Sequence, residues 1–261
     1  MKRLLLSLAL LLVSATALAA VEGEEVSYSA NGTTLKGWLA YDGLAMGKRP
    51  AVLVVHEWWG HNTYARKRAN MLAKLGYVAL AVDMYGDGKQ ANHPGDAGKF
   101  AGEVSKNKAL TKARFEAAMK LLRDDARVDG TKLAAIGYCF GGAVVLNMAR
   151  AGEDLRGVAS FHGGLTTDAP VPKGQVKAQV RVFTGADDKM IPAAQVDAFK
   201  QEMAQAGVNY KVVVYPGAMH SFTNPDADEL GKKFNMPVAY NAAADKDSWA
   251  QLQNFLADVL K

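Results

Sequence analysis

One cysteine and the residues around it carry the clearest sign of chemistry in this sequence. Cys139, the only cysteine, lies at the centre of Gly137-Tyr138-Cys139-Phe140-Gly141, after an apolar run and before an Ala- and Val-rich one. That order predicts a strand, a sharp turn and a helix, a turn that lifts a nucleophile above a sheet. No Gly-x-Ser-x-Gly occurs in the chain, so no serine competes. A buried cysteine beside a glycine turn is the alternative.

Two later residues could complete a catalytic triad with Cys139. Asp188 and His220 each follow an apolar stretch, and the order nucleophile, acid, histidine is that of the α/β-hydrolase fold. In this interpretation the Cys139 sulfur attacks an ester or lactone carbonyl, His220 transfers the proton and Asp188 orients the imidazole. Asp187 is an alternative acid because it is adjacent to Asp188, and His220 could instead be a capping or core-edge histidine.

These residues need a scaffold that brings distant loops together, and the hydropathy pattern predicts one. Asn31-Gly32 between two alternating segments predicts an antiparallel hairpin at one edge. Apolar strands then alternate with amphipathic helices, which predicts an α/β fold with a mostly parallel central sheet and helices on both faces. Ligands bind beyond the carboxyl ends of the strands in such sheets, where the three residues fall. The expected strands are 24–29, 34–41, 51–55, 77–82, the one before Cys139, 157–161, 179–184 and 210–215.

Some connecting segments are predicted with less regular structure. Lys89–Ala101 has the Gly, Asn and Pro content of a long loop that could cover a site. Asn224–Lys246 is polar and has two prolines, which indicates a loop with short helical pieces. Helices are expected over 62–75, 109–122 and Ser248–Leu260.

The first twenty residues are typical of a secretory signal peptide. Lys2 and Arg3 precede an apolar run over 4–13, and Ala17-Leu18-Ala19 offers a small-residue cleavage site, with cleavage after Ala19 or Ala20. The run is shorter than the ~20 residues of a spanning helix, although an uncleaved anchor is the alternative. We therefore expect a periplasmic or secreted protein without membrane association, with one domain over residues 21–261.

Composition excludes several classes of function. The formal net charge is +5, with basic and acidic residues spread along the chain, so nothing indicates nucleic acid binding. One cysteine cannot form an intramolecular disulfide, and the absence of a resolving cysteine argues against a thiol redox protein. No His, Cys, Asp and Glu cluster has metal-ligand spacing, so we expect no metal and no cofactor. The expected partner is a small-molecule ester or lactone, and the expected state is a monomer.

With these residues in place, the chain resembles the dienelactone hydrolase family of α/β hydrolases. The resemblance covers nearly all of residues 21–261, and its motifs are specific only when taken together. It implies hydrolysis through a thioester acyl-enzyme. The segments that carry it are His56-Glu57-Trp58-Trp59-Gly60, Gly137-Tyr138-Cys139-Phe140-Gly141-Gly142, Gly185-Ala186-Asp187-Asp188-Lys189-Met190-Ile191-Pro192 and Gly217-Ala218-Met219-His220-Ser221-Phe222.

The resemblance also implies roles for individual residues. The family pattern Gly-x-x-Asp, with Pro four residues later, selects Asp188 over Asp187. Glu57 corresponds to a carboxylate that helps to activate the cysteine, and the simpler alternative is a loop salt bridge. Developing negative charge on the substrate oxygen needs backbone N–H donors. Phe140, directly after the nucleophile, is one, and the family match gives Trp58 as the other.

Aromatic residues at strand ends could bind the substrate. We expect Trp59, Tyr85 and Phe222 to contribute to such a wall together with Trp58 and Phe140, although plain packing is an equal alternative. The histidines outside the triad have no assigned chemistry: we expect His56 and His162 to be structural, and His61 and His93 to lie in surface loops.

The chain departs from the family in one respect. Relatives that cleave dienelactones have arginines, thought to bind the substrate carboxylate, after the 77–82 strand and just beyond the catalytic histidine. Here Met84–Asp87 and Ser221–Asn224 contain none, so a bidentate carboxylate clamp is missing. The sequence thus predicts an ester or lactone hydrolase without indicating dienelactone as its substrate. A non-catalytic protein that binds a small ligand on the same fold is the alternative.

Overall fold

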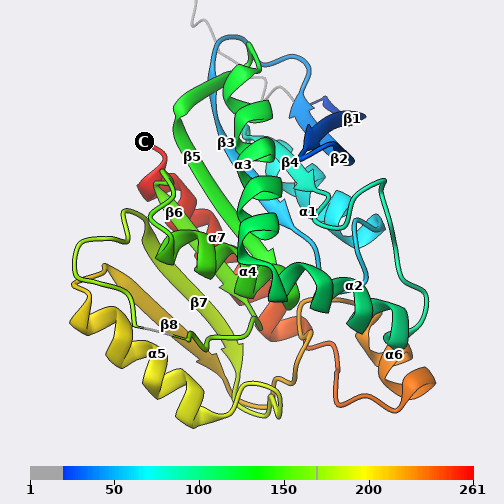
Figure 1. Cartoon of the computed structure of the whole chain (residues 1–261), viewed down its shortest axis with the longest axis vertical. Helices are drawn as coiled ribbons and strands as arrows, with labels where there is room; N and C mark the ends of the chain where they lie inside the picture. The colour runs from blue at the N-terminus through cyan, green and yellow to red at the C-terminus, as the bar shows by residue number, and fades with distance from the viewer. Residues whose placement is uncertain (1–19, 169) are drawn as a thin grey trace, which may run out of the picture.

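A single eight-stranded sheet organises the chain (Figure 1). The computed structural model describes residues 20–168 and 170–261, so the predicted signal peptide lies outside the described residues except for Ala20. The strand order is β1-β2-β4-β3-β5-β6-β7-β8, and all pairs from β4 to β8 are parallel. The predicted α/β fold with a mostly parallel sheet is therefore confirmed. The strands are β1 (Val21–Ala30), β2 (Thr33–Asp42), β3 (Arg49–Val55), β4 (Val78–Val82), β5 (Val128–Tyr138), β6 (Gly157–Phe161), β7 (Gln179–Gly185) and β8 (Tyr210–Tyr215).

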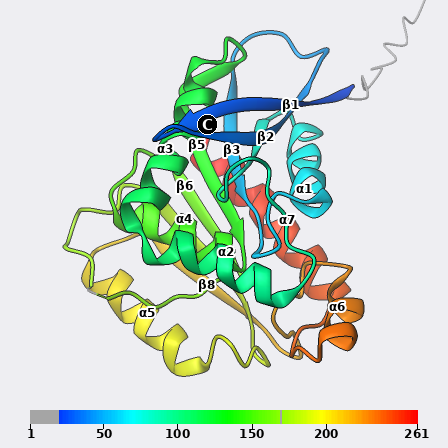
Figure 2. The same cartoon turned by 45° about the vertical axis from the view of Figure 1, so that its right-hand side comes forward.

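The predicted hairpin forms one edge of the sheet. β1 and β2 pair antiparallel over their whole length, and Figure 2 shows them crossing the top of the molecule. Asn31 and Gly32 have φ angles of 50° and 77°. A two-residue turn that matches the twist of its strands needs positive φ at both positions, which asparagine and glycine tolerate best.

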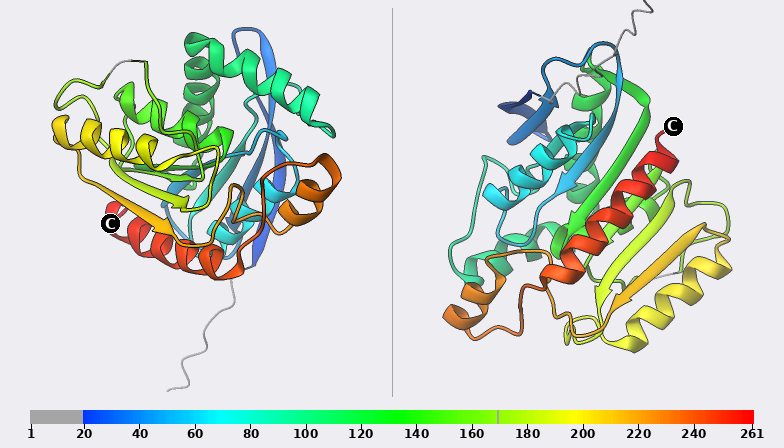
Figure 3. Two further views of the ribbon diagram at one scale, coloured as in Figure 1. Left: turned by 90° about the horizontal axis from the view of Figure 1, so that it is seen from below. Right: turned by 180° about the vertical axis from the view of Figure 1, so that it is seen from behind.

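Helices cover both faces of the sheet, as predicted. Alternate side chains of β3 point into two different apolar clusters, Leu53 and Val55 into one and Val52 and Val54 into the other. The first cluster includes side chains of α3 (Lys108–Asp124), α4 (Phe140–Arg150) and α5 (Ala193–Gln205), and the second those of α1 (Thr63–Ala73) and α7 (Ala242–Val259). The rear view in Figure 3 shows α1 and α7 lying across their face.

Two helix predictions need correction. The segment after Lys89 is a loop only up to His93, because α2 occupies Pro94–Lys106. Proline suits the first turn of a helix, and the His93 side chain accepts a hydrogen bond from the Gly95 N–H (3.1 Å). Gly98 leaves no gap in the packing, because a Cβ there would meet nothing within 4 Å.

The last helix begins earlier than predicted. α7 starts at Ala242 rather than Ser248, because the Asn241 side chain accepts a hydrogen bond from the Ala244 N–H (3.0 Å) and caps it. The short helical piece expected between Asn224 and Lys246 is α6 (Ala227–Phe234). Among the helices that the structure describes, none combines the length and apolar character needed to cross a bilayer.

Figures 1 and 2 show α2 and α6 beyond the carboxyl ends of the strands, and we call these two helices the cap. A small apolar cluster joins the cap to the loop after β3. It consists of Trp59, Ala91 and Ala97 with Trp58, Phe100, Leu230, Phe234 and Met236 packed against them. The cap therefore covers the edge of the sheet where the sequence predicts the site.

Candidate active site

Cys139 occupies a strained turn between β5 and α4. Its φ and ψ angles are 53° and −115°, a region that residues with a side chain rarely adopt. A Cβ at Gly137 would lie 2.1 Å from the Gly141 carbonyl oxygen, and one at Gly141 would lie 2.3 Å from that of Val55. Only glycine fits at these two positions, which explains the Gly-x-Cys-x-Gly spacing. The turn leaves Cys139 partly exposed, as a nucleophile requires.

His220 and Asp188 are in direct contact. Nδ1 of His220 lies 2.8 Å from Oδ2 of Asp188, and the Asp188 side chain is fully buried. Oδ1 of Asp188 accepts hydrogen bonds from the backbone N–H groups of Met190 (2.8 Å) and Ile191 (3.2 Å), which fix the carboxylate. Since the carboxylate accepts, Nδ1 carries a proton and Nε2 faces the other way. Asp187, the alternative acid, is exposed.

His220 and Cys139 line the same cavity, and they interact electrostatically. Nε2 of His220 is buried and forms no hydrogen bond of standard geometry within the described chain. Burial lowers the pKa of His220, but the charge of Cys139 and the contact with Asp188 outweigh it and raise that pKa to about 10. An imidazolium beside a sulfur stabilises the thiolate, which is the reactive form of cysteine.

Glu57 lies behind this pair, at the start of the loop that follows β3. Its side chain is buried, and Oε2 accepts a hydrogen bond of 2.6 Å from Nδ2 of Asn224, while Oε1 has no partner in the described chain. Burial raises the pKa of Glu57 and outweighs the opposing effect of Asn224 and Ser221. None of the ion pairs between described residues involves Glu57, so the structure does not support the alternative of a loop salt bridge.

Asn224 was not expected to take part in the site. It lies 167 positions from Glu57 in the sequence and lines the cavity. The signal that could have indicated it is its place in Ser221–Asn224, the stretch where the resemblance implies an arginine. The carboxyl group of Glu57 is therefore hydrogen-bonded by a neutral amide, that of Asn224.

A buried histidine supports the nucleophile from beneath. The Cys139 N–H donates to the Phe161 carbonyl oxygen (2.9 Å) and to Nδ1 of His162 (3.1 Å). Nδ1 therefore lacks a proton, and Nε2–H of His162 donates to Oγ1 of Thr223 (2.8 Å). Burial, together with the nearby positive charges of His220 and Arg68, holds the pKa of His162 well below its usual value. His162 thus stays neutral beside the titrating histidine.

Arg68 holds the segment that follows His220. Its Nη2 donates to the Thr223 carbonyl oxygen (2.8 Å) and to Oδ1 of Asp245 (2.6 Å). The guanidinium lies 5.2 to 5.4 Å from the ring centroids of Tyr64, Tyr138 and Trp249. Such cation–π contacts stabilise a buried charge whose carboxylate partner is close. Helices α1 and α7 therefore fix the backbone of this segment.

The cavity above Cys139 has a volume of about 90 Å³ and mostly apolar walls. Trp58 and Trp59 line it, as the sequence predicts. The rest of the lining consists of Cys139, Met190, His220, Ser221, Asn224, Ala227, Leu230, Met236 and Val238. Met190, Leu230, Met236 and Val238 carried no sequence signal, because methionine and aliphatic residues are equally common in cores.

Tyr85 and Phe222, expected to bind substrate, lie behind the cavity rather than in its wall. The Tyr85 hydroxyl donates to the Trp58 carbonyl oxygen (2.9 Å), so it positions the loop after β3. Phe222 is fully buried, with its ring centroid 5.3 Å from that of His162. The chain turns inward at Ser221, where φ is 59°, and this directs Phe222 into the core.

The backbone groups expected to bind the substrate oxygen lie in two segments that the structure ties together. Phe140 is the first residue of α4, so its N–H has no acceptor within the helix. The loop that carries Trp58 is attached to the elbow because the Gly141 N–H donates to the His56 carbonyl oxygen (3.1 Å). Both segments therefore keep a constant position relative to Cys139.

The remaining histidines differ from expectation at one position. His56 is buried and bridges two backbone groups: Nε2 accepts from the Met84 N–H (3.3 Å), and Nδ1 donates to the Glu57 carbonyl oxygen (2.5 Å). His93 is exposed. The prediction of a surface position for His61 is wrong, since it is 1% exposed and burial lowers its pKa to about 3. The turn at Gly60, with φ of 90°, folds His61 beneath the loop.

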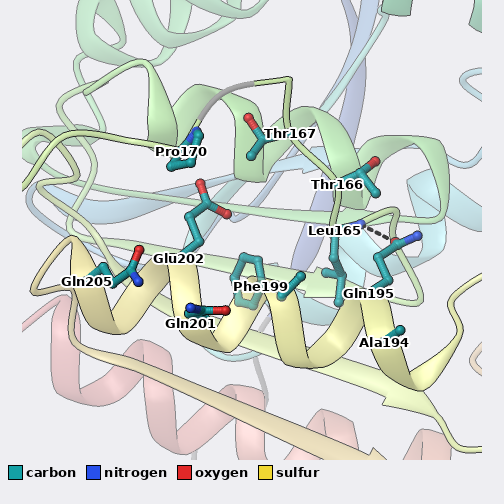
Figure 4. Close-up of a pocket in the computed structure, with 11 residues that line it drawn as sticks. Leu165, Thr166, Thr167, Pro170, Ala194, Gln195, Phe199, Gln201, Glu202 and Gln205 are labelled. Carbon is teal, nitrogen blue, oxygen red and sulfur yellow. Dashed lines mark hydrogen bonds between the residues drawn. The ribbon is translucent and has the colours of Figure 1, made fainter.

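A larger cavity, of about 600 Å³, lies between α5 and the segment after β6 (Figure 4). Gln195 accepts a hydrogen bond from the Leu165 N–H (2.8 Å) across it, and Glu202 is paired with the buried Arg150. It shares no lining residue with the cavity above Cys139 and contains no cysteine or histidine. Over residues 20–168 and 170–261, no group of three His, Cys, Asp or Glu side chains could hold a metal ion.

Comparisons with known proteins match nearly the whole chain to one protein family. The model of the dienelactone hydrolase family matches residues 35–260. A putative carboxymethylenebutenolidase of Synechocystis sp. is 28% identical over 246 residues, which cover 87% of this chain and 93% of that protein. The crystal structure of a dienelactone hydrolase-like promiscuous phosphotriesterase from metagenomic libraries has a TM-score of 0.87 and 34% identity, over 93% of this chain and all of that one. A putative dienelactone hydrolase from Klebsiella pneumoniae, 24% identical with a TM-score of 0.75 over 91% of this chain and 99% of that one, shares the fold.

Proposed function

Since the chain belongs to the dienelactone hydrolase family, we propose that it hydrolyses carboxylic esters or lactones through a thioester on Cys139. The observation that carries the proposal is the 2.8 Å contact between His220 and Asp188, with His220 and Cys139 on one cavity. Curated relatives named putative carboxymethylenebutenolidase, and one named as a probable lactonase from Bradyrhizobium sp., support this class of substrate.

In the first step the Cys139 sulfur attacks the carbonyl carbon, and a C–S bond forms. The negative charge that develops on the carbonyl oxygen is stabilised by the backbone N–H groups of Phe140 and Trp58. The C–O bond to the leaving alcohol then breaks, and Nε2–H of His220 donates its proton to the departing oxygen. The acyl group remains on sulfur as a thioester, and His220 is neutral.

In the second step water releases the acyl group. Nε2 of His220 takes a proton from a water molecule while the oxygen of that water attacks the thioester carbon. The C–S bond then breaks. The products are a carboxylic acid and the original thiolate–imidazolium pair. Asp188 holds the imidazole in one orientation through both steps and stabilises its charged form.

We further propose that Glu57 helps to activate the cysteine. Its buried carboxyl group interacts electrostatically with His220, and burial favours its neutral form, so its protonation is coupled to that of the catalytic pair. The hydrogen bond from Asn224 leaves one of its oxygens available for exchange of a proton. The conservative change Glu57→Gln keeps the size and removes the proton exchange.

The test uses the chain from residue 21 onward with p-nitrophenyl acetate and small lactones. Wild type should give a burst of nitrophenol equal to the enzyme concentration, and an acetylated Cys139 peptide should appear by mass spectrometry when the reaction is stopped. Cys139→Ala and His220→Ala should each lose turnover by about 10³-fold or more. A phosphotriester belongs in the panel because of the relative named above.

A working nucleophile also reacts with thiol reagents at neutral pH, whereas an inert buried thiol does not. A Cys139 thiol that resists alkylation at neutral pH, together with no turnover of any ester or lactone, would favour the alternative, a binding protein on the same fold. Full turnover by the Cys139→Ala protein would exclude the proposed mechanism.

We also propose that the protein is exported, with residues 1–20 removed. The support is the sequence pattern of Lys2, Arg3 and the apolar run that follows. Expression of the full chain in a bacterium, followed by fractionation and mass analysis of the N-terminus, tests this. A cytoplasmic protein that still begins at Met1 would contradict it.

A further inference from the structure

The walls of the cavity above Cys139 carry no formal charge beyond the reacting pair of Cys139 and His220. The side chains that extend it away from the sulfur are apolar and come from three places in the chain: Trp58 and Trp59, Met190, and the segment 227–238. The two polar neighbours are neutral, and one of them, Asn224, already donates to Glu57. A substrate group in this space therefore meets sulfur, methylene groups and aromatic rings.

The apolar wall is attached to the catalytic histidine. The backbone of Val238 pairs with that of His220, and the Ala239 N–H donates to the His220 carbonyl oxygen (3.2 Å). The Met236 N–H donates to the Gly231 carbonyl oxygen (3.0 Å). The chain also passes close to Gly231, because a Cβ on that residue would lie 2.7 Å from the Val238 carbonyl oxygen. These contacts keep Leu230 and Met236 at a constant position over the reacting atoms.

Size and polarity together restrict what this space can hold. The volume of about 90 Å³ is far below the ~300–1,000 Å³ of sites for drug-sized ligands. A carboxylate placed there would lose its hydration, and the cation in the lining, the His220 imidazolium, is already paired with the Cys139 sulfur and Asp188. The added negative charge would be left without a partner of its own, and an unpaired buried charge is strongly unfavourable. A short alkyl chain would lose nothing and would bury apolar surface.

We propose that this cavity selects neutral esters with a short apolar acyl group, and that Met190, Leu230 and Met236 set the selectivity. The proposal rests on the proposed function and adds the substrate class. The wall formed by the 227–238 segment should favour acyl chains of about two to four carbons. Esters whose acyl group carries a carboxylate are excluded.

The test compares p-nitrophenyl butyrate with the mono-p-nitrophenyl ester of succinic acid, which has an acyl chain of the same length and a terminal carboxylate. For wild type, kcat/KM should be at least about tenfold higher for the butyrate ester, and p-nitrophenyl octanoate should also fall about tenfold below it. Equal kcat/KM for the butyrate and succinate esters would overturn the proposal, and so would equal kcat/KM for butyrate and octanoate.

Met190→Arg places a cation at the wall, and its matched control is Met46→Arg. Both methionines are exposed, 44% and 92%, so neither change threatens folding, and only Met190 lines the cavity. Met190→Arg should raise the ratio of succinate to butyrate kcat/KM by about tenfold, and Met46→Arg should leave it unchanged. Met236→Arg is the second variant and should act in the same direction. An unchanged ratio in both wall variants would contradict the assignment of these residues.

A measurement that needs no turnover separates this proposal from the proposed function. The rates of alkylation of Cys139 by iodoacetamide and by iodoacetate compare a neutral and an anionic reagent of similar size. Wild type should prefer iodoacetamide, and Met190→Arg should reduce that preference about tenfold while Met46→Arg does not. If no ester is hydrolysed but this pattern appears, the function fails and the selectivity of the cavity stands. If esters are hydrolysed and neither reagent nor ester is discriminated by charge, only the inference about selectivity fails.

Discussion

The two halves of the candidate site are built in different ways. The nucleophile half is local: Cys139 takes its position from the turn between β5 and α4, and Gly137 and Gly141 within two residues of it allow that turn to close. The histidine half depends on distant segments. Thr223, three residues after His220, is held by Arg68 from 155 positions away, and Asn224 contacts Glu57 from 167 positions away.

This difference indicates which half can exchange side chains without losing its backbone geometry. A local turn that admits only glycine tolerates almost no substitution. A segment held by long-range contacts can exchange the side chains that face the cavity while its backbone stays fixed. In this chain the histidine half has the hydrogen bond from Asn224 to Glu57 and an apolar wall over residues 227–238. Under the selectivity proposed above, it is the half that sets the substrate class.

The largest loss of activity should come from removing the carboxylate that contacts His220. Asp188→Asn keeps the shape but removes the charge that fixes the Nδ1–H tautomer of His220, so kcat should fall by about 10³- to 10⁴-fold. The matched control is Asp187→Asn at the adjacent exposed carboxylate, which should stay within about twofold. Steady-state kinetics with p-nitrophenyl acetate checks both. A larger loss in Asp187→Asn than in Asp188→Asn would reassign the acid.

The nucleophile half should fail through geometry rather than charge. Gly141→Ala puts a Cβ 2.3 Å from the Val55 carbonyl oxygen, so the turn must open, with a loss of about 1–3 kcal/mol of unfolding free energy and about 100-fold in kcat. Gly98→Ala in α2 is the control, because its Cβ would meet open space. This change should raise the free energy of unfolding by about 0.5–1 kcal/mol. Urea unfolding and kinetics measure the two effects. Unchanged kcat in Gly141→Ala would show that the turn is not rigid.

A smaller effect should follow from loosening the long-range support. Arg68→Lys keeps the positive charge but cannot hold the Thr223 carbonyl and Asp245 at once, so kcat should fall about tenfold while KM changes little. Arg66→Lys on the same helix is the control. Nη2 of Arg66 lies 3.3 Å from Oε2 of Glu25, whose side chain is half exposed, and an exposed ion pair contributes little. Equal kinetics for the two variants would contradict the view that Arg68 positions the segment after His220.

The smallest effect concerns pH and stability. Because the pKa of His220 is raised to about 10 in the folded protein, its protonated form stabilises the fold fully below the ordinary histidine pKa of about 6.5. This contribution is lost as pH rises through about 10. The Tm of wild type should therefore fall between pH 7 and pH 10 more than that of His220→Gln, while His93→Gln, at an exposed position, should follow wild type. Parallel curves for wild type and His220→Gln would contradict the raised pKa.

Several features of the fold and site could be read directly from the sequence because they depend on neighbouring residues. The hairpin at Asn31-Gly32 and the elbow around Cys139 need specific φ angles, which only a few residue types tolerate. The parallel sheet follows from continuous apolar strands that must be buried on both faces. Helix α2 was missed because its glycines resemble those of a loop. A short helix of this kind is stabilised by packing, here of Ala97 and Phe100 against Trp59 and its neighbours, rather than by its composition.

The sequence by itself therefore determined the sheet, the turn that exposes the sulfur, and the order of the candidate acid and histidine. The tertiary structure alone decided that Asn224 contacts Glu57, that Tyr85 and Phe222 lie behind the cavity, that His61 is buried, and that Met190, Leu230 and Met236 form the wall. The physical reason is that backbone geometry restricts residue type at the position itself. Contact between segments more than a hundred residues apart depends on how the whole sheet packs, and an ordinary methionine or asparagine carries no mark of it.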